Sequence, residues 1–412
     1  MASARVVNFG AGPSALPTSV LEKAQEGLLN FNNTGMGIAE ISHRSKEFTS
    51  FLSSVESNIR AQLDVPPTHS ILFTQGGGTG QFSAVVLNML ARYRLLNPEV
   101  KAEDVVMDYV VTGSWSKKAA EESRRLAGPG GVKTNVVVDS RKYSKDGKSF
   151  DNIPLHSEYA FSADPAVIYY CENETVDGVQ FSHEDAAPSS FPYELLKKGS
   201  LLPLVGDYSS SFMSRPIPHL AEHAVIFAGA QKNIGPAGLT ILIVRQDCIV
   251  DVDAATRLGV PPVPITMSYK TLADGSSLYN TPSVLPIYIA GLVLERSQEL
   301  GGLKYYEALN RRKMEKLYGV LKEGEEKGVF QRKVQEGSGS WTNVVFTVLP
   351  EGGEQRFLAG AEMEGMKSLK GHRYVTGIRA SLYNAITEED TDRLVTFMKS
   401  FMNEEATKTA QA

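Results

Sequence analysis

The chain has 412 residues, of which 42% are hydrophobic and 22% are charged, and its formal net charge is −5. This apolar content excludes disorder over most of the chain, and the length predicts about two to three domains. The acidic excess is atypical of general nucleic-acid binders, which carry a basic surplus, but it allows a local basic pocket for a small anion.

The number of cysteines and the hydropathy of the chain predict the cellular compartment of the protein. Cys171 and Cys248 are too few for a disulfide framework or a zinc site, which indicates a reducing compartment with both thiols buried. The opening MASARVVNFG contains no apolar run typical of a signal peptide. No stretch approaches the ~20 apolar residues that cross a bilayer. We expect a cytoplasmic protein without nucleic-acid or membrane partners, and we assign no metal ligands.

Seven short apolar runs alternate with helical patterns along the first 250 residues. Continuous apolar runs are typical of strands buried on both faces of a parallel or mostly parallel sheet. Between them, Thr79–Arg92 has apolar residues at helical spacing, which predicts a helix with one apolar stripe. The predicted strands are Ser70–Thr74, Val105–Val111, Asn135–Val138, Ala166–Cys171, Leu202–Val205, Ala224–Ala228 and Leu239–Val244.

The pattern changes after the turn-rich stretch Asn280–Pro286. We expect one long helix over Leu285–Gly324, then the elements of a smaller α+β domain, and a polar tail from Asn403 that frays. The expected elements are a strand at Trp341–Leu349, a helix at Glu354–Glu364, the segment Leu369–Leu382 and a helix at Thr387–Phe401. The sequence thus predicts a large α/β domain over 18–300 and a small domain built from 1–17 and 301–412.

The loop Gln75–Gly80 is the first candidate for chemistry, because ligands of open α/β sheets bind at the carboxyl ends of strands. Its three consecutive glycines allow close approach of the backbone, and the helix that follows offers unpaired N–H groups. Such a loop is typical of a phosphate site, although a tight strand-to-helix turn explains the glycines equally well. No lysine follows where a Walker loop requires one.

Two further loops add a carboxylate and an amine. Asp207 follows an apolar run, where a helix cap is the simpler role. Lys232 lies among small residues between two apolar strands, where desolvation lowers the pKa of an amine and makes it a nucleophile, although most lysines are solvated. A phosphate cradle, a carboxylate and a lysine are what pyridoxal 5′-phosphate (PLP) needs. Trp115 either stacks on the cofactor ring or packs in the core.

Longer motifs run nearly end to end, and GAQKNIGPAG together with GHR and RAS is the most specific combination. They are Asn8–Pro13, Ile41–Phe48, Gly76–Phe82, Asn173–Gly178, Asp207–Ser210, Gly229–Gly238, Tyr279–Pro282, Lys370–Arg373 and Gly377–Ser381. In these motifs the chain resembles the phosphoserine aminotransferase family, in the class V, fold-type I group of PLP enzymes. The resemblance implies a mostly parallel seven-stranded sheet flanked by helices, plus a smaller α+β C-terminal domain.

The resemblance also implies roles for the cofactor. Lys232 would bind PLP covalently and move the proton at the substrate α-carbon, and Asp207 would pair with the pyridinium. Trp115 would stack on the ring, and Thr175 would donate a hydrogen bond to the phenolic oxygen. The amides of Gly78 and Thr79 would bind the phosphate, with help from Gln231. Asn280 and Thr281 would reach the phosphate from the other subunit, which implies a homodimer. Some relatives carry arginine where this chain has Thr79, so only its backbone and hydroxyl are available.

For the substrate, the resemblance implies Arg379 as the clamp of the α-carboxylate and a phosphate cluster of His43, Arg44, His372 and Arg373. It implies a ping-pong exchange of 3-phosphohydroxypyruvate and L-glutamate for O-phospho-L-serine and 2-oxoglutarate, a step of L-serine biosynthesis.

Several alternatives stay open. They are an alanine–glyoxylate type aminotransferase, a cysteine desulfurase, a non-catalytic PLP- or phosphate-binding protein, and a nucleotide-binding protein. Cys171 and Cys248 sit at strand ends like packing residues, which disfavours the desulfurase. Only chemistry needs Lys232 and Asp207 together, which disfavours the non-catalytic protein.

Overall fold

The computed structural model describes residues 5–197, 201–372 and 377–411. The seven predicted strands form one sheet in the order β2-β10-β9-β8-β5-β3-β4, and every strand end lies within two residues of its predicted place. Strand β10 runs antiparallel to β2 and β9, and the other pairs are parallel. The strands are β2 (His69–Thr74), β3 (Val106–Val111), β4 (Lys133–Asp139), β5 (Val167–Cys171), β8 (Leu204–Asp207), β9 (His223–Gly229) and β10 (Thr240–Arg245).

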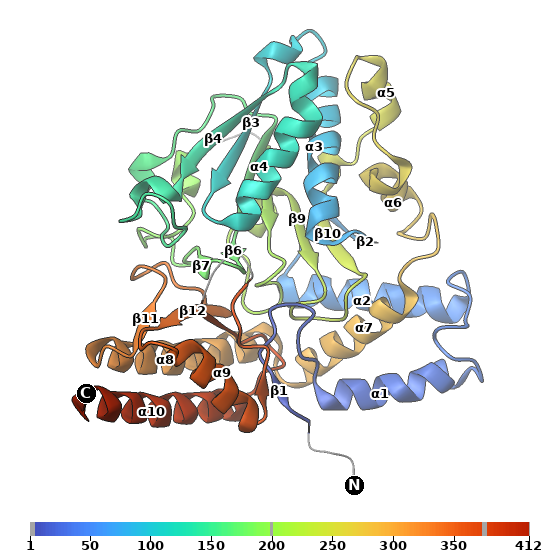
Figure 1. Ribbon diagram of the computed structural model, residues 1–412. Helices are drawn as coiled ribbons and strands as arrows, with labels where there is room; N and C mark the ends of the chain where they lie inside the picture. Colours follow the sequence, from blue (N-terminus) through green and yellow to red (C-terminus); the bar gives the residue numbers. More distant parts are fainter. Residues whose placement is uncertain (1–4, 198–200, 373–376, 412) are drawn as a thin grey trace.

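The two faces of this sheet pack into separate cores, because successive side chains of a strand point to opposite faces. Leu242 and Phe227 pack with α3 and α4, which lie in front of the sheet in Figure 1. Ile241 and Ile226 pack with α1, α2 and α7. The helices of this region are α1 (Thr18–Leu29), α2 (Lys46–Leu63), α3 (Gly77–Leu96), α4 (Ser114–Ala127), α5 (Val252–Arg257), α6 (Tyr269–Asp274) and α7 (Val284–Glu299).

Helix α3 differs from its prediction. The expectation of one apolar stripe is wrong, because nearly every residue from Gln81 to Tyr93 is buried. The helix is wedged between β9, α4 and α5, so it meets protein on several sides. Asn88 is buried among these contacts and its amide donates to the carbonyls of Ala84 and Met267 at 2.8 Å each.

The expected long helix is two helices, α7 and α8 (Gly302–Glu326). The chain breaks at Gly301 and Gly302, whose φ values of +108° and +67° lie in the left-handed region that favours glycine. The predicted frayed tail is also wrong, because α10 (Glu388–Gln411) continues through it. Glu405 of this helix is buried and accepts hydrogen bonds from Arg356, which anchors the last turns.

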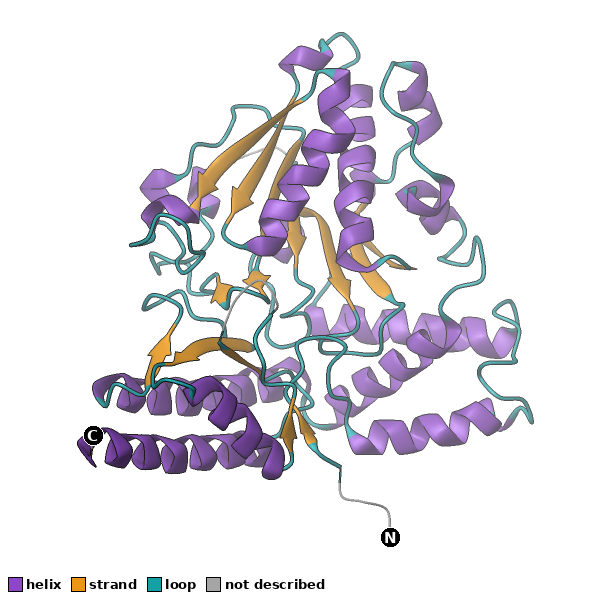
Figure 2. Ribbon diagram, in the orientation of Figure 1, coloured by secondary structure: helices purple, strands orange, loops and turns teal. Residues whose placement is uncertain are grey.

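Helices α8, α9 (Gly353–Met363) and α10 pack with a three-stranded sheet of β11 (Phe330–Arg332), β12 (Asn343–Val348) and β14 (Ile378–Ser381). Figure 2 shows this layer below the large sheet. The N-terminal strand β1 (Val7–Asn8) pairs with β13 (Met366–Lys367), so the first described residues join this third core. Among the described residues no helix is long and apolar enough to cross a membrane.

Candidate active site

Lys232 lies in the turn after β9, and the N-terminal segment covers it. Its Nζ donates to the carbonyl of Ala11 at 2.6 Å, and the hydroxyl of Tyr383 donates to the same carbonyl at 2.9 Å. Burial and the nearby Arg379 guanidinium lower the pKa of Lys232 to about 8, and Asp207 opposes this shift. The amine is therefore far easier to deprotonate than an ordinary lysine.

Asp207 ends β8 and is buried. Its Oδ1 accepts from the Ser209 N–H at 2.9 Å, and its Oδ2 accepts weakly from Tyr169 at 3.4 Å. Burial raises the pKa of this carboxyl, while Ser209 and Lys232 lower it. None of the ion pairs among the described residues involves Asp207. The interpretation of Asp207 as a helix cap does not fit, since only a short turn follows β8.

The glycine loop forms the start of α3 directly against Asp207. Gly76 and Gly77 have φ values of +101° and +61°, which bend the chain from β2 into the helix. A Cβ atom built on Gly78 would lie 3.7 Å from Asp207 Oδ2, so the backbone of Gly78 borders the carboxylate. The amides of Gly78 and Thr79 lie in the first turn, where a helix favours an anion.

A short hairpin of β6 (Asn173–Glu174) and β7 (Val179–Gln180) joins three predicted site residues. The N–H of Trp115, at the start of α4, donates to Glu174 Oε2 at 2.8 Å. Thr175 follows in the hairpin turn, and its carbonyl accepts from Arg379 Nη1 at 3.2 Å. Burial lowers the pKa of Arg379. Trp115, Thr175 and Arg379 are thus connected through one turn.

Gln231 lies beside Lys232, and its main-chain carbonyl accepts from the Ser14 N–H at 3.1 Å. Its side chain folds back over Gly229, where an added Cβ would lie 2.6 Å from Gln231 Oε1. The structure therefore places Gln231 at the same strand end as Lys232.

The predicted phosphate cluster lies only partly within the described residues. His43 and Arg44 lie in the turn before α2, where Arg44 is exposed. His43 Nε2 is buried and has no hydrogen-bond partner among the described residues. His372 is half-buried at the end of a described segment, and Arg373 lies outside the described residues.

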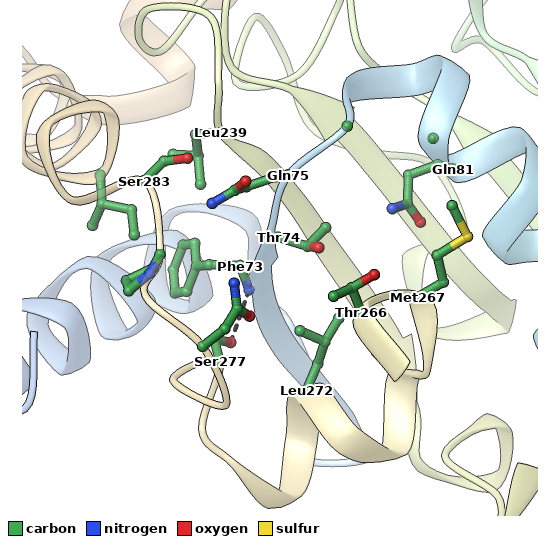
Figure 3. A pocket seen from close by; sticks show the side chains of 15 residues that line it. Phe73, Thr74, Gln75, Gln81, Leu239, Thr266, Met267, Leu272, Ser277 and Ser283 are labelled. Carbon is green, nitrogen blue, oxygen red and sulfur yellow. Dashed lines mark hydrogen bonds between the residues drawn. The ribbon is translucent and has the colours of Figure 1, made fainter. Parts of the chain in front are cut away.

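Asn280 and Thr281 are exposed in the loop between α6 and α7. Asn280 lines a pocket of about 350 Å³ on the side of the glycine loop, and Gln75 Nε2 donates to the Thr281 carbonyl at 3.5 Å. Figure 3 shows this pocket, with the Phe73 N–H to Ser277 Oγ bond at its floor. The lining of this pocket includes Gly76 and Gly80 of the glycine loop but not Lys232 or Asp207.

The sequence interpretation missed three contacts at the site. The Lys232 amine and the Tyr383 hydroxyl both donate to the Ala11 carbonyl, and the buried Glu174 carboxylate accepts from the start of α4. Ala11 and Glu174 lie inside matched motifs, which is the one signal that pointed to them. No group of His, Cys, Asp or Glu among the described residues has the arrangement of a metal site.

Comparison with known proteins gives a consistent result. The aminotransferase class-V family model matches residues 6–394. Phosphoserine aminotransferase 1, chloroplastic, of Arabidopsis thaliana is 40% identical, covering 98% of this chain and 84% of that protein. Phosphoserine aminotransferase of Ectopseudomonas mendocina is 38% identical, covering 98% of this chain and all of that protein. The solved PLP-bound phosphoserine aminotransferase from Trichomonas vaginalis is 34% identical with a TM-score of 0.80, covering 96% of this chain and all of that one.

Proposed function

Because this chain belongs to the aminotransferase class-V family, we propose that it is a PLP-dependent phosphoserine aminotransferase. It would convert 3-phosphohydroxypyruvate and L-glutamate to O-phospho-L-serine and 2-oxoglutarate by ping-pong transamination. The names of relatives that match over nearly the whole chain support the substrate. The observation that carries the chemistry is the buried Asp207 carboxylate, which borders Gly78 at the start of α3 and acts electrostatically on the Lys232 amine.

The residues around Asp207 fit PLP in three respects. The first-turn amides of Gly78 and Thr79 suit a phosphate. The buried Asp207 has no ion-pair partner among the described side chains, so it suits a protonated ring nitrogen. The missing side chain of Gly78 leaves the carboxylate open on the side that faces the helix start.

When bound, PLP supplies an electron sink for negative charge at the substrate α-carbon. Asp207 keeps the ring nitrogen protonated, because a buried carboxylate stabilises a neighbouring cation. The Nζ of Lys232, with a pKa of about 8, is partly neutral near neutral pH. It can therefore accept the proton that the substrate α-carbon loses and give this proton up again later in the exchange.

Arg379 is proposed to bind the α-carboxylate of either amino donor. Its planar fork matches a carboxylate, and the Thr175 carbonyl holds one of its nitrogens at 3.2 Å. The second anion of the substrate, a phosphate or the side-chain carboxylate of glutamate, would meet His43, Arg44, His372 and Arg373. The unpartnered Nε2 of His43 supports this, because it leaves one buried ring nitrogen ready for a ligand.

A homodimer with shared sites is part of the proposal. Asn280 and Thr281 are exposed, and the pocket that Asn280 lines does not include Lys232. They would therefore reach the cofactor phosphate of the partner subunit. The cytoplasmic location is proposed on the two buried free cysteines, which suit a reducing compartment.

We also propose the division into a large domain over 18–300 and a small domain of 1–17 with 301–412. The pairing of β1 with β13 and the third core, which joins Phe9 to α8 and α10, support it.

The proposal is tested with the PLP-loaded protein and four amino donors, namely phosphoserine, glutamate, serine and alanine. We expect phosphoserine and glutamate to bleach the visible cofactor band and alanine and serine to leave it. Arg379→Gln should weaken both active donors, whereas the matched Arg141→Gln, on an arginine paired with Asp139 at the end of β4, should not. A protein that takes up no PLP, or that responds to alanine alone, would contradict the proposal.

A further inference from the structure

The first turn of α4 is held by side chains from a distant hairpin. Helix α4 begins after Gly113, which has no side chain to cap it. The N–H groups of Trp115 and Ser116 donate to the two oxygens of Glu174 at 2.8 Å each, and the Ser116 hydroxyl adds a third bond at 2.6 Å. The Ser114 N–H donates to Asp177 at 2.8 Å.

This remote cap places two buried carboxylates side by side. Asp177 has an ion-pair partner, Lys333, at 2.8 Å. Glu174 is fully buried without an ion-pair partner among the described residues, and burial together with Asp177 raises its pKa to about 8. A serine or aspartate at position 113 would cap the helix locally without this cost. The remote cap has one effect that a local cap lacks. It connects the backbone of Trp115 to Glu174, the residue next to Thr175.

Gly113, before α4, lies in close contact with the hairpin that carries Glu174. A Cβ atom added there would lie 2.3 Å from Cγ and Cδ of Glu174. The φ of Gly113 is −170°, which is extended backbone that any residue adopts. The glycine is therefore required by the approach of the carboxylate and not by the backbone conformation.

The ring of Trp115 depends on this anchor. It is only half-buried, with Phe82 at 6.4 Å between ring centroids and the Lys118 amine at 4.5 Å from the ring centroid. The ring packs against the core on one side only partly, so its position also depends on the backbone at the start of α4.

We propose that Glu174 is a positioning residue, whose carboxylate holds Trp115 and Thr175 in one arrangement against the cofactor ring. This inference rests on the proposed function, in which Trp115 stacks on PLP. Glu174 itself does not touch the reacting atoms and acts only through its neighbours. Glutamine is the informative substitution, because its amide would place a donor against one of the two N–H groups.

The experiment measures PLP dissociation constants for the full chain and for Glu174→Gln, Trp115→Ala and the double variant. We expect Glu174→Gln to weaken PLP binding by ~10-fold, which corresponds to the loss of one of the hydrogen bonds that hold the start of α4. In the Trp115→Ala background the same change should weaken PLP binding by less than about twofold, because the ring through which Glu174 acts is absent. An equal loss in both backgrounds, or no loss in either, would overturn the inference.

Asp108→Asn is the matched control. Asp108 is also buried and accepts three hydrogen bonds, from the Ser162 N–H, the Ser162 hydroxyl and the Asn135 amide. It should lower the unfolding midpoint without changing the PLP affinity. If Glu174→Gln fails to fold, Gly113→Ala replaces it, since it displaces the carboxylate without removing it.

A readout without cofactor separates this inference from the proposed function. In a Trp341→Phe background Trp115 is the one tryptophan left, and Glu174→Gln should shift its emission and increase its quenching by acrylamide. Unchanged emission overturns the positioning role, whatever the protein does with PLP. Failure of the unaltered chain to bind PLP, with emission that shifts as expected, instead contradicts the proposed function and limits Glu174 to holding Trp115.

Discussion

Replacing the buried Lys313 of α8 by methionine should change how stability depends on pH. Lys313 is fully buried, and its Nζ donates to the carbonyls of Leu382, Tyr383 and Ile386 at 2.8, 3.0 and 2.9 Å. This loop carries the Tyr383 hydroxyl to Ala11 and so to Lys232. Burial lowers the pKa of Lys313 to about 7, against the opposing effect of Asp390 and Glu388.

The sign follows from proton binding. Between pH 7 and 10.5 the unfolded chain keeps the Lys313 proton while the folded chain releases it. The free energy of unfolding therefore rises with pH in this window, by at most about 1.4 kcal/mol per pH unit. Lys313→Met removes this contribution and also leaves three buried carbonyls without their donor. The deficit of the variant relative to the unaltered protein should thus grow by about 2.5 kcal/mol from pH 7.5 to 9.5.

Urea unfolding at pH 7.5, 8.5 and 9.5 measures this difference, and the comparison of variants cancels the other titrating groups. Lys316→Met is the matched control, because Lys316 lies on the same helix but pairs with Asp392 at the surface. Its effect should stay under about 1 kcal/mol at each pH. A deficit of Lys313→Met that is constant across the three pH values would refute the buried, depressed pKa of Lys313.

Three further outcomes are expected. Asp207→Asn should lower kcat by about 10²–10³ while the protein stays folded, measured by steady-state transamination and circular dichroism; an unchanged kcat would remove Asp207 from the mechanism. Gly291→Ala, whose Cβ would lie 2.4 Å from an aromatic ring of α2, should cost ~1–3 kcal/mol in urea unfolding, whereas Gly319→Ala, with nothing within 4 Å, should stabilise α8 by up to about 1 kcal/mol. Inactive Asn280→Ala and Lys232→Ala subunits, unfolded and refolded together, should regain about a quarter of the activity if sites are shared across the dimer, and none if each chain serves its own site.

The large sheet was predictable because its strands are continuous apolar runs that are buried on both faces. The stripe of α3 was not, because a polar residue such as Asn88 looks exposed in sequence until its distant carbonyl partners are known. The end of α10 was missed for the same reason, since Glu405 is fixed by Arg356, which lies far away in the chain. Hydrophobic periodicity indicates which residues share a face of one helix, but it contains no information on hydrogen-bond partners from distant parts of the chain.

At the site, the sequence predicted the side chains whose chemistry is special, namely Lys232, Asp207 and the glycine loop. It could not predict the Ala11 carbonyl, because every residue carries one and only the fold brings this one to the amine. Glu174 was hidden among many acidic residues, and its role depends on a helix 59 positions away.

The most direct test of Lys232 as the cofactor-binding residue is to trap the cofactor and identify the lysine that holds it. PLP is added to the purified chain, the protein is reduced with borohydride, and the modified peptide is identified by mass spectrometry. We expect the cofactor to be attached to Lys232 and Lys232→Ala to retain no visible cofactor band. Attachment to another lysine, or a band that persists in Lys232→Ala, would contradict it.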